Sequence, residues 1–303
     1  MLETLEHYST LSLYSAMAVY AIAFVFYAVD LANRSGDAAS AQASAGATHT
    51  SAAGGSTLTM TRTQTAQKNA PAPRSRALRV GFALTVVGFL FHLAATVLRG
   101  IGAGRVPFAN MYEFGLSATV AIVAVFLLMQ FFIDLRFLGA LVTGLVVLFL
   151  GVCKVNYYVD IVPLPPALDS YWLVIHILVA VLATGFFTLS FGLSVLQLLQ
   201  TRRENQIKVG NTASLRFVSS LPTAVRLEDF AYRMAIVGFV FWSFTLIAGS
   251  IWAERAWSRY WGWDTKEVWT FVIWVLYAGF IHARATRGWR GTRSAWLSIV
   301  AYS

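Results

Sequence analysis

Three histidines of this chain lie within long apolar segments, where an ionisable side chain is costly. His92 lies in GFLFHLAAT, His176 in YWLVIHILVA and His282 in AGFIHARAT. An ionisable group inside a bilayer costs about 3 kcal/mol on insertion scales, so its presence favours a functional role. No intramembrane chain of Asp or Glu accompanies these histidines, which favours ligation of a metal or of haem iron over a proton relay. The alternative is a neutral imidazole bonded to a neighbouring helix.

Tryptophans are concentrated near one connecting segment, SIWAERAWSRYWGWDTKEVWTF, and seven of the ten lie between positions 252 and 289. An interfacial aromatic belt would spread over every span and both interfaces. Indole faces also stack on a flat macrocycle such as haem, while basic side chains meet its carboxylates. Both interpretations stay open on spacing alone. If residues 257–261 are helical, Trp257 and Trp261 share one face. The aromatic and charged residues of the segment are Trp257, Trp261, Trp263, Trp269, Arg255, Arg259, Asp264, Lys266 and Glu267.

The elements that must position these residues are membrane helices. Of 303 residues, 57% are hydrophobic and 12% charged, which excludes a soluble globule and disorder of the whole chain. The single cysteine, Cys153, excludes a disulfide scaffold and is typical of a packed span residue. We therefore predict an all-α polytopic transmembrane helical bundle with seven complete spans of about 20 residues each. The apolar runs lie near 10–31, 78–98, 114–134, 137–153, 171–200, 230–252 and 267–283.

Two further predictions concern the ends of the chain. An eighth apolar run opens at Ser294 and stops at Ser303, short of a crossing, so we expect a fragment with a truncated eighth helix. Glu3 and Glu6 stand where a cleavable signal peptide carries Lys or Arg. Residues 1–32 are therefore expected to form an N-terminal transmembrane helix with its N-terminus outside.

The net charge of +9 is interpreted as membrane topology, with no nucleic acid as a partner. Alternate loops divide the Lys and Arg residues into 17 on one side and six on the other. By the positive-inside rule the richer side is cytoplasmic. The outer side then receives residues 99–113, 154–170 and 253–266, where the chemistry is to be sought.

Residues 33–77 interrupt the apolar pattern. Ala, Ser, Thr and Gly make up 29 of these 45 positions. Such a stretch buries too little apolar surface to offset its backbone entropy, so we predict a disordered cytoplasmic linker. Residues 78–303 then form the membrane domain, with its outer tryptophan loop at 253–267.

Several stretches resemble one known family. The string from Trp257 to Glu267 is similar to the tryptophan-rich WWD signature of the haem-handling proteins of cytochrome c maturation. Within that superfamily the chain most resembles the CcsA-type subunit of system II, also called CcsB or ResC. GRVPFANMYEF and LDSYWLVIH resemble the family's outer motif and the segment of its first external histidine. The family often has Gly at the position of Ser258 and Pro at that of Thr265.

The resemblance implies a ligand set for haem b. His92 and His282 become an intramembrane pair of iron ligands, and His176 becomes one of two external ligands. A surface of three indoles would lie beside His176, formed by Trp257, Trp261 and Trp263. Asp264 would fix the loop. The second external histidine is expected beyond Ser303. At 1.5 Å per residue, His92 lies roughly 21 Å from Leu78 and His282 roughly 22 Å from Glu267, so their pairing requires tilted helices.

The implied function is cytochrome c biogenesis in the bacterial plasma membrane. The chain would bind haem in the bilayer and present it outside to the C-x-x-C-H segment of apocytochrome c, as a subunit of a holocytochrome c synthase with a ResB-type partner. Its contribution would be ligation and orientation, because no residue stands out as a nucleophile or general acid. Three alternatives are a system I WWD haem-delivery protein, a b-haem electron-transfer subunit of a respiratory complex, and a solute transporter.

Overall fold

The computed structural model describes residues 2–48, 75–162, 169–209, 216–286 and 289–303. Within these ranges, seven helices are long and apolar enough to cross a membrane. The predicted all-α bundle with seven complete spans is thereby confirmed. The helices are α1 (Leu2–Thr48), α2 (Arg76–Ala103), α3 (Met111–Met129), α4 (Gly139–Asn156), α5 (Tyr171–Lys208), α6 (Ala224–Trp257), α7 (Thr265–Ala285) and α8 (Thr292–Tyr302), with short 3₁₀ turns η1 (Arg136–Leu138) and η3 (Arg216–Val218).

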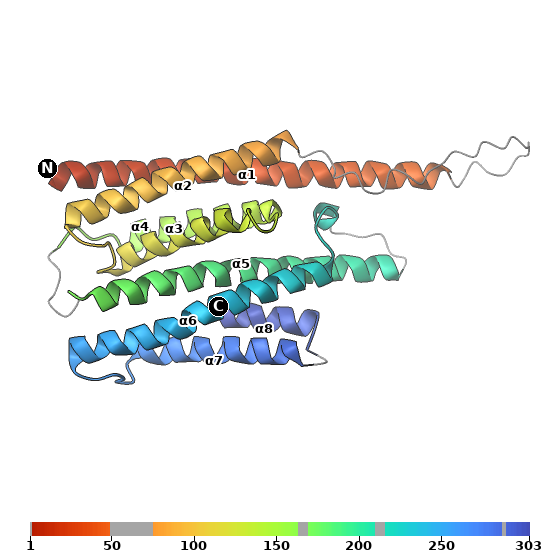
Figure 1. Cartoon of the computed structure of the whole chain (residues 1–303). Coiled ribbons are helices and arrows are strands. Elements are labelled where there is room, and N and C mark those ends of the chain that lie inside the picture. Colours follow the sequence, from red (N-terminus) through yellow and green to blue (C-terminus); the bar gives the residue numbers. More distant parts are fainter. Residues whose placement is uncertain (1, 49–74, 163–168, 210–215, 287–288) are drawn as a thin grey trace, which may run out of the picture.

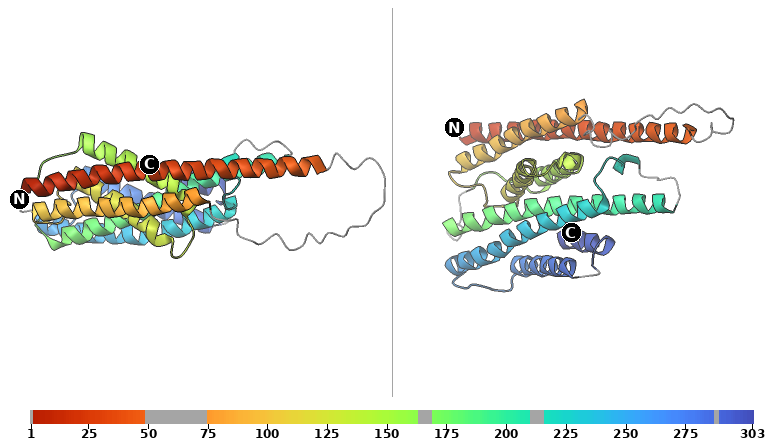
Figure 2. Two further views of the ribbon diagram at one scale, coloured as in Figure 1. Left: turned by 90° about the horizontal axis from the view of Figure 1, so that it is seen from above. Right: turned by 45° about the vertical axis from the view of Figure 1, so that its right-hand side comes forward.

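The helices succeed one another across the bundle roughly in chain order. Figure 1 shows α1 and α2 along one side, α3 and α4 next to them, then α5 and α6, with α7 and α8 on the opposite side. The right-hand view of Figure 2 gives the same order. The most extensive contacts join α1 to α2 and α5 to α6. Because each helix satisfies its own backbone hydrogen bonds, this arrangement suits a bilayer.

Aromatic and aliphatic side chains fill the space between the layers. Leu13, Tyr20 and Phe126 are almost fully buried in the main apolar cluster, which joins α1 to α6. Small residues bring helices close together, as is usual in membrane bundles. A methyl group on Gly185 of α5 would stand 3.1 Å from the carbonyl oxygen of Ala121 on α3. This close approach brings the N-terminal half of α5 against α3.

The first helix is longer than predicted. It continues from the membrane span to Thr48, so the expected linker over 33–77 is wrong for residues 33–48. Alanine is the best helix former, and extending an existing helix costs far less than nucleating one, which outweighs the low hydrophobicity of the stretch. Residues 49–74 of that expectation lie outside the described residues. Ser75 caps α2 and also bonds Asp30 of α1.

The described parts of the connections expected outside the cell lie at one end of the bundle. In Figure 1 the α2–α3 and α6–α7 connections lie at the left, beside the N-terminus and the start of α5. We call this the outer end. The α3–α4 and α7–α8 connections lie at the other end, which we call the inner end. Helix α8 starts there and has 11 residues, about 16 Å at 1.5 Å per residue, so it stops short of a crossing, as predicted.

Candidate functional site

His176 lies on α5, between one and two turns from its start at Tyr171, and its ring faces α6. Its Nδ1 atom is 3.0 Å from the carbonyl oxygen of Thr245. Its ring lies nearly parallel to that of Trp252, with 6.1 Å between centroids and 15° between planes. The side chain is partly accessible, and among the described residues Nε2 has no hydrogen-bond partner. The structure thus leaves one imidazole nitrogen of His176 available to a ligand.

The tryptophan loop begins where α6 ends. Ser258 has the left-handed conformation, with φ 55° and ψ 31°, and closes the helix after Trp257. Residues 257–261 are therefore not helical, and the conditional expectation of one shared helical face for Trp257 and Trp261 is wrong. The left-handed angle at Ser258 suits the glycine that the resembled family often carries there, because glycine lacks the Cβ that disfavours this region.

Trp263 is held outward by an unusual backbone conformation. Its φ is 59°, and its side chain is 75% exposed. A non-glycine residue in this region costs about 1–2 kcal/mol, and such outliers cluster at ligand sites. The ring of Trp261 meets that of Trp263 edge to face at 5.9 Å, and Trp257 is 44% exposed. We call these three indoles, at the end of α6 and in the loop before α7, the tryptophan surface.

Asp264 holds the loop through the first turn of α7. Its carboxylate accepts a hydrogen bond from the backbone N–H of Glu267 at 2.9 Å, and the Glu267 carboxylate accepts from the backbone N–H groups of Asp264 and Gly262. This reciprocal pair is a capping box. Asp264 thus accepts a local hydrogen bond of the expected kind, and its role in fixing the loop for a ligand stays a prediction.

One cationic side chain contacts the tryptophan surface, and two more lie close to it in the sequence. The guanidinium of Arg259 lies 5.6 Å from the centre of the Trp257 ring and pairs with Glu267 at 3.5 Å. The guanidinium of Arg255 lies 5.0 Å from the centre of the Tyr171 ring at the start of α5. Arg255 and Lys266 are exposed, so their charges can meet the carboxylates of a ligand on the surface.

His92 has a different environment. Its side chain is fully buried on α2, with Nδ1 3.5 Å from the Tyr20 hydroxyl and Nε2 3.4 Å from the Thr119 hydroxyl. The Tyr20 ring meets the imidazole edge to face at 5.9 Å. Both ring nitrogens face hydroxyls of neighbouring helices, so the imidazole leaves no open coordination position. This arrangement fits a hydrogen-bonded link among α1, α2 and α3 better than haem ligation.

His282 lies near the inner end of α7 and is exposed. Helices α3 to α6 stand between α7 and α2 (Figure 1). The expected pair of His92 and His282 is therefore not brought together in this structure. The arrangement of the helices explains this result. The sequence showed only that the two histidines differ in depth, whereas the structure places α2 and α7 on opposite sides of the bundle.

Sequence reasoning missed a charged cluster at the outer end. Glu113 of α3, fully buried, accepts from Arg105 at 2.6 Å and from Arg99 at 3.3 Å. Arg99 is 1% exposed and also pairs with Glu6 of α1 at 3.1 Å. Asn110 caps α3 by accepting from the Glu113 N–H. The cap spacing Asn110 to Glu113 was the local signal for the helix start, but the ion pairs depend on which helices are neighbours.

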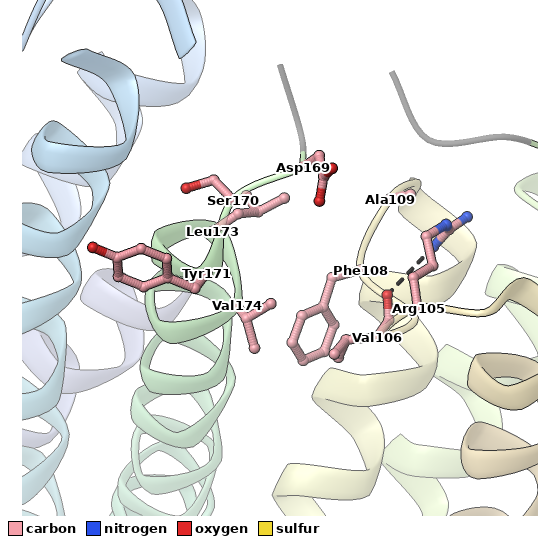
Figure 3. A pocket seen from close by; sticks show the side chains of 9 residues that line it. All are labelled: Arg105, Val106, Phe108, Ala109, Asp169, Ser170, Tyr171, Leu173 and Val174. Atoms are coloured by element: carbon pink, nitrogen blue, oxygen red, sulfur yellow. Dashed lines mark hydrogen bonds between the residues drawn. The ribbon is translucent and has the colours of Figure 1, made fainter. Parts of the chain in front are cut away.

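A small cleft lies beside this cluster, between the start of α5 and the α2–α3 connection. Figure 3 shows Phe108 and Val174 facing each other across it, with Asp169 and Arg105 near its rim. Its volume is about 150 Å³. Pockets for drug-sized ligands are about 300–1,000 Å³, so this cleft does not enclose a macrocycle. A haem at the outer end would therefore lie on the open tryptophan surface.

The donor set at the outer end fits haem. An imidazole with one available nitrogen, exposed indoles and exposed cations provide an axial ligand, stacking faces and partners for carboxylates. The space for the His176 ring exists because position 249 on α6 is glycine: a Cβ there would stand 2.7 Å from Cε1 of His176. The tertiary structure thus joins His176 to the start of the tryptophan loop through Trp252, whose ring meets Trp257 at 4.8 Å.

The chain is similar to known proteins of cytochrome c assembly. Residues 108–303 match the family model described as cytochrome C assembly protein. The cytochrome c biogenesis protein CcsA of Heterosigma akashiwo is 31% identical over 225 residues, covering 65% of this chain and 70% of that protein. CcsA of Trieres chinensis is 28% identical over 251 residues, covering 72% and 80%.

A solved structure shares the fold. The cytochrome c haem lyase CcmF superposes with a TM-score of 0.65 at 15% identity, over 98% of this chain. The chain spans 46% of the length of that protein.

Proposed function

The chain belongs to the cytochrome c assembly protein family, and we propose that it holds haem on the tryptophan surface and presents it for attachment to apocytochrome c. The family match covers 108–303, which includes His176, His282 and the whole loop, whereas His92 lies outside it. A role in cytochrome c biogenesis and haem handling follows from the family. The ligands and partners given below are our proposal.

One observation carries the proposal: His176 keeps Nε2 available, and its ring stacks on Trp252, which meets the exposed Trp257 of the tryptophan surface. His176 would ligate the haem iron, and Trp257, Trp261 and Trp263 would orient the macrocycle. Arg255 and Lys266 are exposed near them and would meet the propionates. Haem, when bound, supplies the two vinyl groups that form thioethers with the thiols of a C-x-x-C-H segment. The chain's own residues bind and orient, which lowers the entropic cost of bringing the reactants together.

The proposal also names the cofactor, an inner haem position, the membrane and the partner subunit. The proposed cofactor is haem b, because the vinyl groups must be intact before attachment. His282 would serve a second, inner position, since its imidazole is exposed on α7. We propose a bacterial plasma membrane location and a ResB-type partner within a holocytochrome c synthase. The CcsA relatives favour this system II assignment over a CcmF-type protein, because CcsA proteins are 28–31% identical to the chain and CcmF is 15% identical.

The test is haem content together with cytochrome c output. Full-length protein purified from haem-replete cells should show a Soret band and a pyridine haemochrome spectrum of haem b. His176→Ala should lose the haem that His176 ligates and should lower holocytochrome c on a haem-stained gel. Preparations without a Soret band, or normal cytochrome c output from His176→Ala at normal abundance, would overturn the proposal.

A further inference from the structure

A backbone carbonyl on α6 fixes the state of the His176 ring. The Nδ1 atom is 3.0 Å from the carbonyl oxygen of Thr245. A carbonyl only accepts hydrogen bonds, so Nδ1 must carry the proton in this contact. In neutral imidazole the other nitrogen, Nε2, then keeps its lone pair. Histidines that bind metals usually donate their second N–H to a carbonyl or carboxylate in this way.

Gly249 provides the space for that bond. A Cβ at position 249 would stand 2.7 Å from Cε1 and 2.9 Å from Nδ1 of His176, closer than side-chain carbons approach other atoms. The imidazole cannot withdraw without losing its bond to Thr245 and its stacking on Trp252. The glycine, one turn after Thr245, therefore permits an interhelical bond that no other residue would allow in this geometry.

Trp252 limits rotation of the ring. Its indole lies 6.1 Å from the imidazole at 15°, within the 4.5–7 Å range of offset aromatic pairs. Trp252 packs beside the buried Leu173 and Ile177 of α5. The indole thus has a fixed position, and the imidazole is held between it, the Thr245 carbonyl and the Cα of Gly249.

We propose that Thr245, Gly249 and Trp252 are positioning residues for haem ligation: they set the tautomer and plane of His176 so that Nε2 points to the iron. This inference rests on the proposed function, because it requires His176 to be a haem ligand. Positioning residues of this kind typically contribute 10- to 100-fold to metal affinity.

The test compares Gly249→Ala with Gly279→Ala in the full-length membrane protein. Gly279 is also inside a helix, and a Cβ there meets nothing within 4 Å, so the control makes the same change in helix propensity without touching the ring. The readouts are haem content and the optical spectrum, with and without exogenous imidazole. The wild-type spectrum minus the His176→Ala spectrum defines the haem that His176 ligates.

Gly249→Ala should lower that haem component by about 10-fold or more, and imidazole should restore it. Gly279→Ala should leave it unchanged, because a Cβ at position 279 meets nothing within 4 Å. If His176→Ala loses haem while Gly249→Ala keeps the wild-type spectrum, the positioning inference is wrong and the proposed function stands. If His176→Ala itself keeps the wild-type spectrum, the proposed function is wrong and the inference falls with it.

A second pair of variants tests the inference if the Gly249→Ala protein accumulates poorly. Trp252→Phe keeps an aromatic face beside the imidazole, whereas Trp252→Leu removes it. The leucine variant should shift the spectrum toward that of His176→Ala, and the phenylalanine variant should stay close to wild type. Equal spectra for both, at wild-type haem content, would overturn the part of the inference that concerns Trp252.

Discussion

Arg99 on α2 and Glu113 on α3 form an ion pair at the outer end of the bundle, with 3.3 Å between Nε and Oε1, although both side chains are almost completely buried. Arg99 also donates to the carbonyl of Val159 at 2.6 Å, just after α4. The pair therefore joins the ends of three helices that surround the α2–α3 connection. It acts on the site indirectly, by fixing the frame against which α5 packs.

Removing one partner of this pair should destabilise the protein strongly. Glu113→Ala leaves Arg105 without its carboxylate and Arg99 with Glu6 alone, and an uncompensated buried charge costs about 3–5 kcal/mol. We expect a lower midpoint of thermal unfolding in detergent and less protein in the membrane. Asp134→Asn is the control, because Asp134 pairs with Arg136 at the surface and its side chain is 55% exposed, where pairs are worth about 0–1 kcal/mol. Equal stability of the two variants would contradict the prediction.

Holocytochrome c output should depend on the indole side chains of the tryptophan surface. Trp261→Ala and Trp263→Ala should each lower holocytochrome c output by about 2- to 10-fold, since an aromatic contact is worth about 0.5–1.5 kcal/mol beyond burial. Trp296 is 51% exposed on α8, away from the loop, so Trp296→Ala is the control. Output is measured by haem stain beside an immunoblot of each variant. Normal output from both loop variants would identify an interfacial anchor instead.

The capping role of Asp264 predicts a graded effect. Asparagine caps helices about as well as aspartate, whereas alanine loses about 0.5–2 kcal/mol. Asp264→Asn should therefore keep holocytochrome c output near normal, and Asp264→Ala should reduce it at normal abundance. Loss of output in the asparagine variant would mean that the charge of Asp264 acts on the ligand directly.

His92 and His282 should respond differently to imidazole. In His282→Ala, exogenous imidazole should restore lost haem, because the wild-type side chain is exposed and the ligand can enter its place. In His92→Ala the buried contacts with Tyr20 and Thr119 are lost, at about 1–3 kcal/mol for the groups left unpaired. That variant should unfold more easily, and imidazole should not change its haem content. Imidazole-dependent recovery of haem in His92→Ala would restore His92 as a ligand.

Sidedness can be checked with fusions. A reporter active only outside the cytoplasm should work within residues 253–266 and fail within residues 33–77, as the 17 to 6 division of Lys and Arg predicts. Signals in the reverse order would place His176 on the cytoplasmic side and remove the basis of the external site.

The membrane spans and the cap of α7 were predictable from the sequence because their signals are local. A bilayer requires each spanning segment to satisfy its own backbone, so about 20 apolar residues are enough to predict a helix. The seven spans follow from that rule. The capping box of Asp264 and Glu267 is likewise local, since its partners are three residues apart. The concentration of tryptophans beside it made the loop a candidate ligand site.

Other features were decided by the tertiary structure. Which helices become neighbours depends on side-chain packing over the whole bundle, and that packing separates His92 from His282, buries Arg99 against Glu113 and brings Gly249 to the ring of His176. Residues 33–48 are helical because the preceding span supplies a nucleus that composition alone does not reveal. The sequence therefore determined the candidate side chains and their helices, while the lateral order of those helices determined which of them can share one ligand.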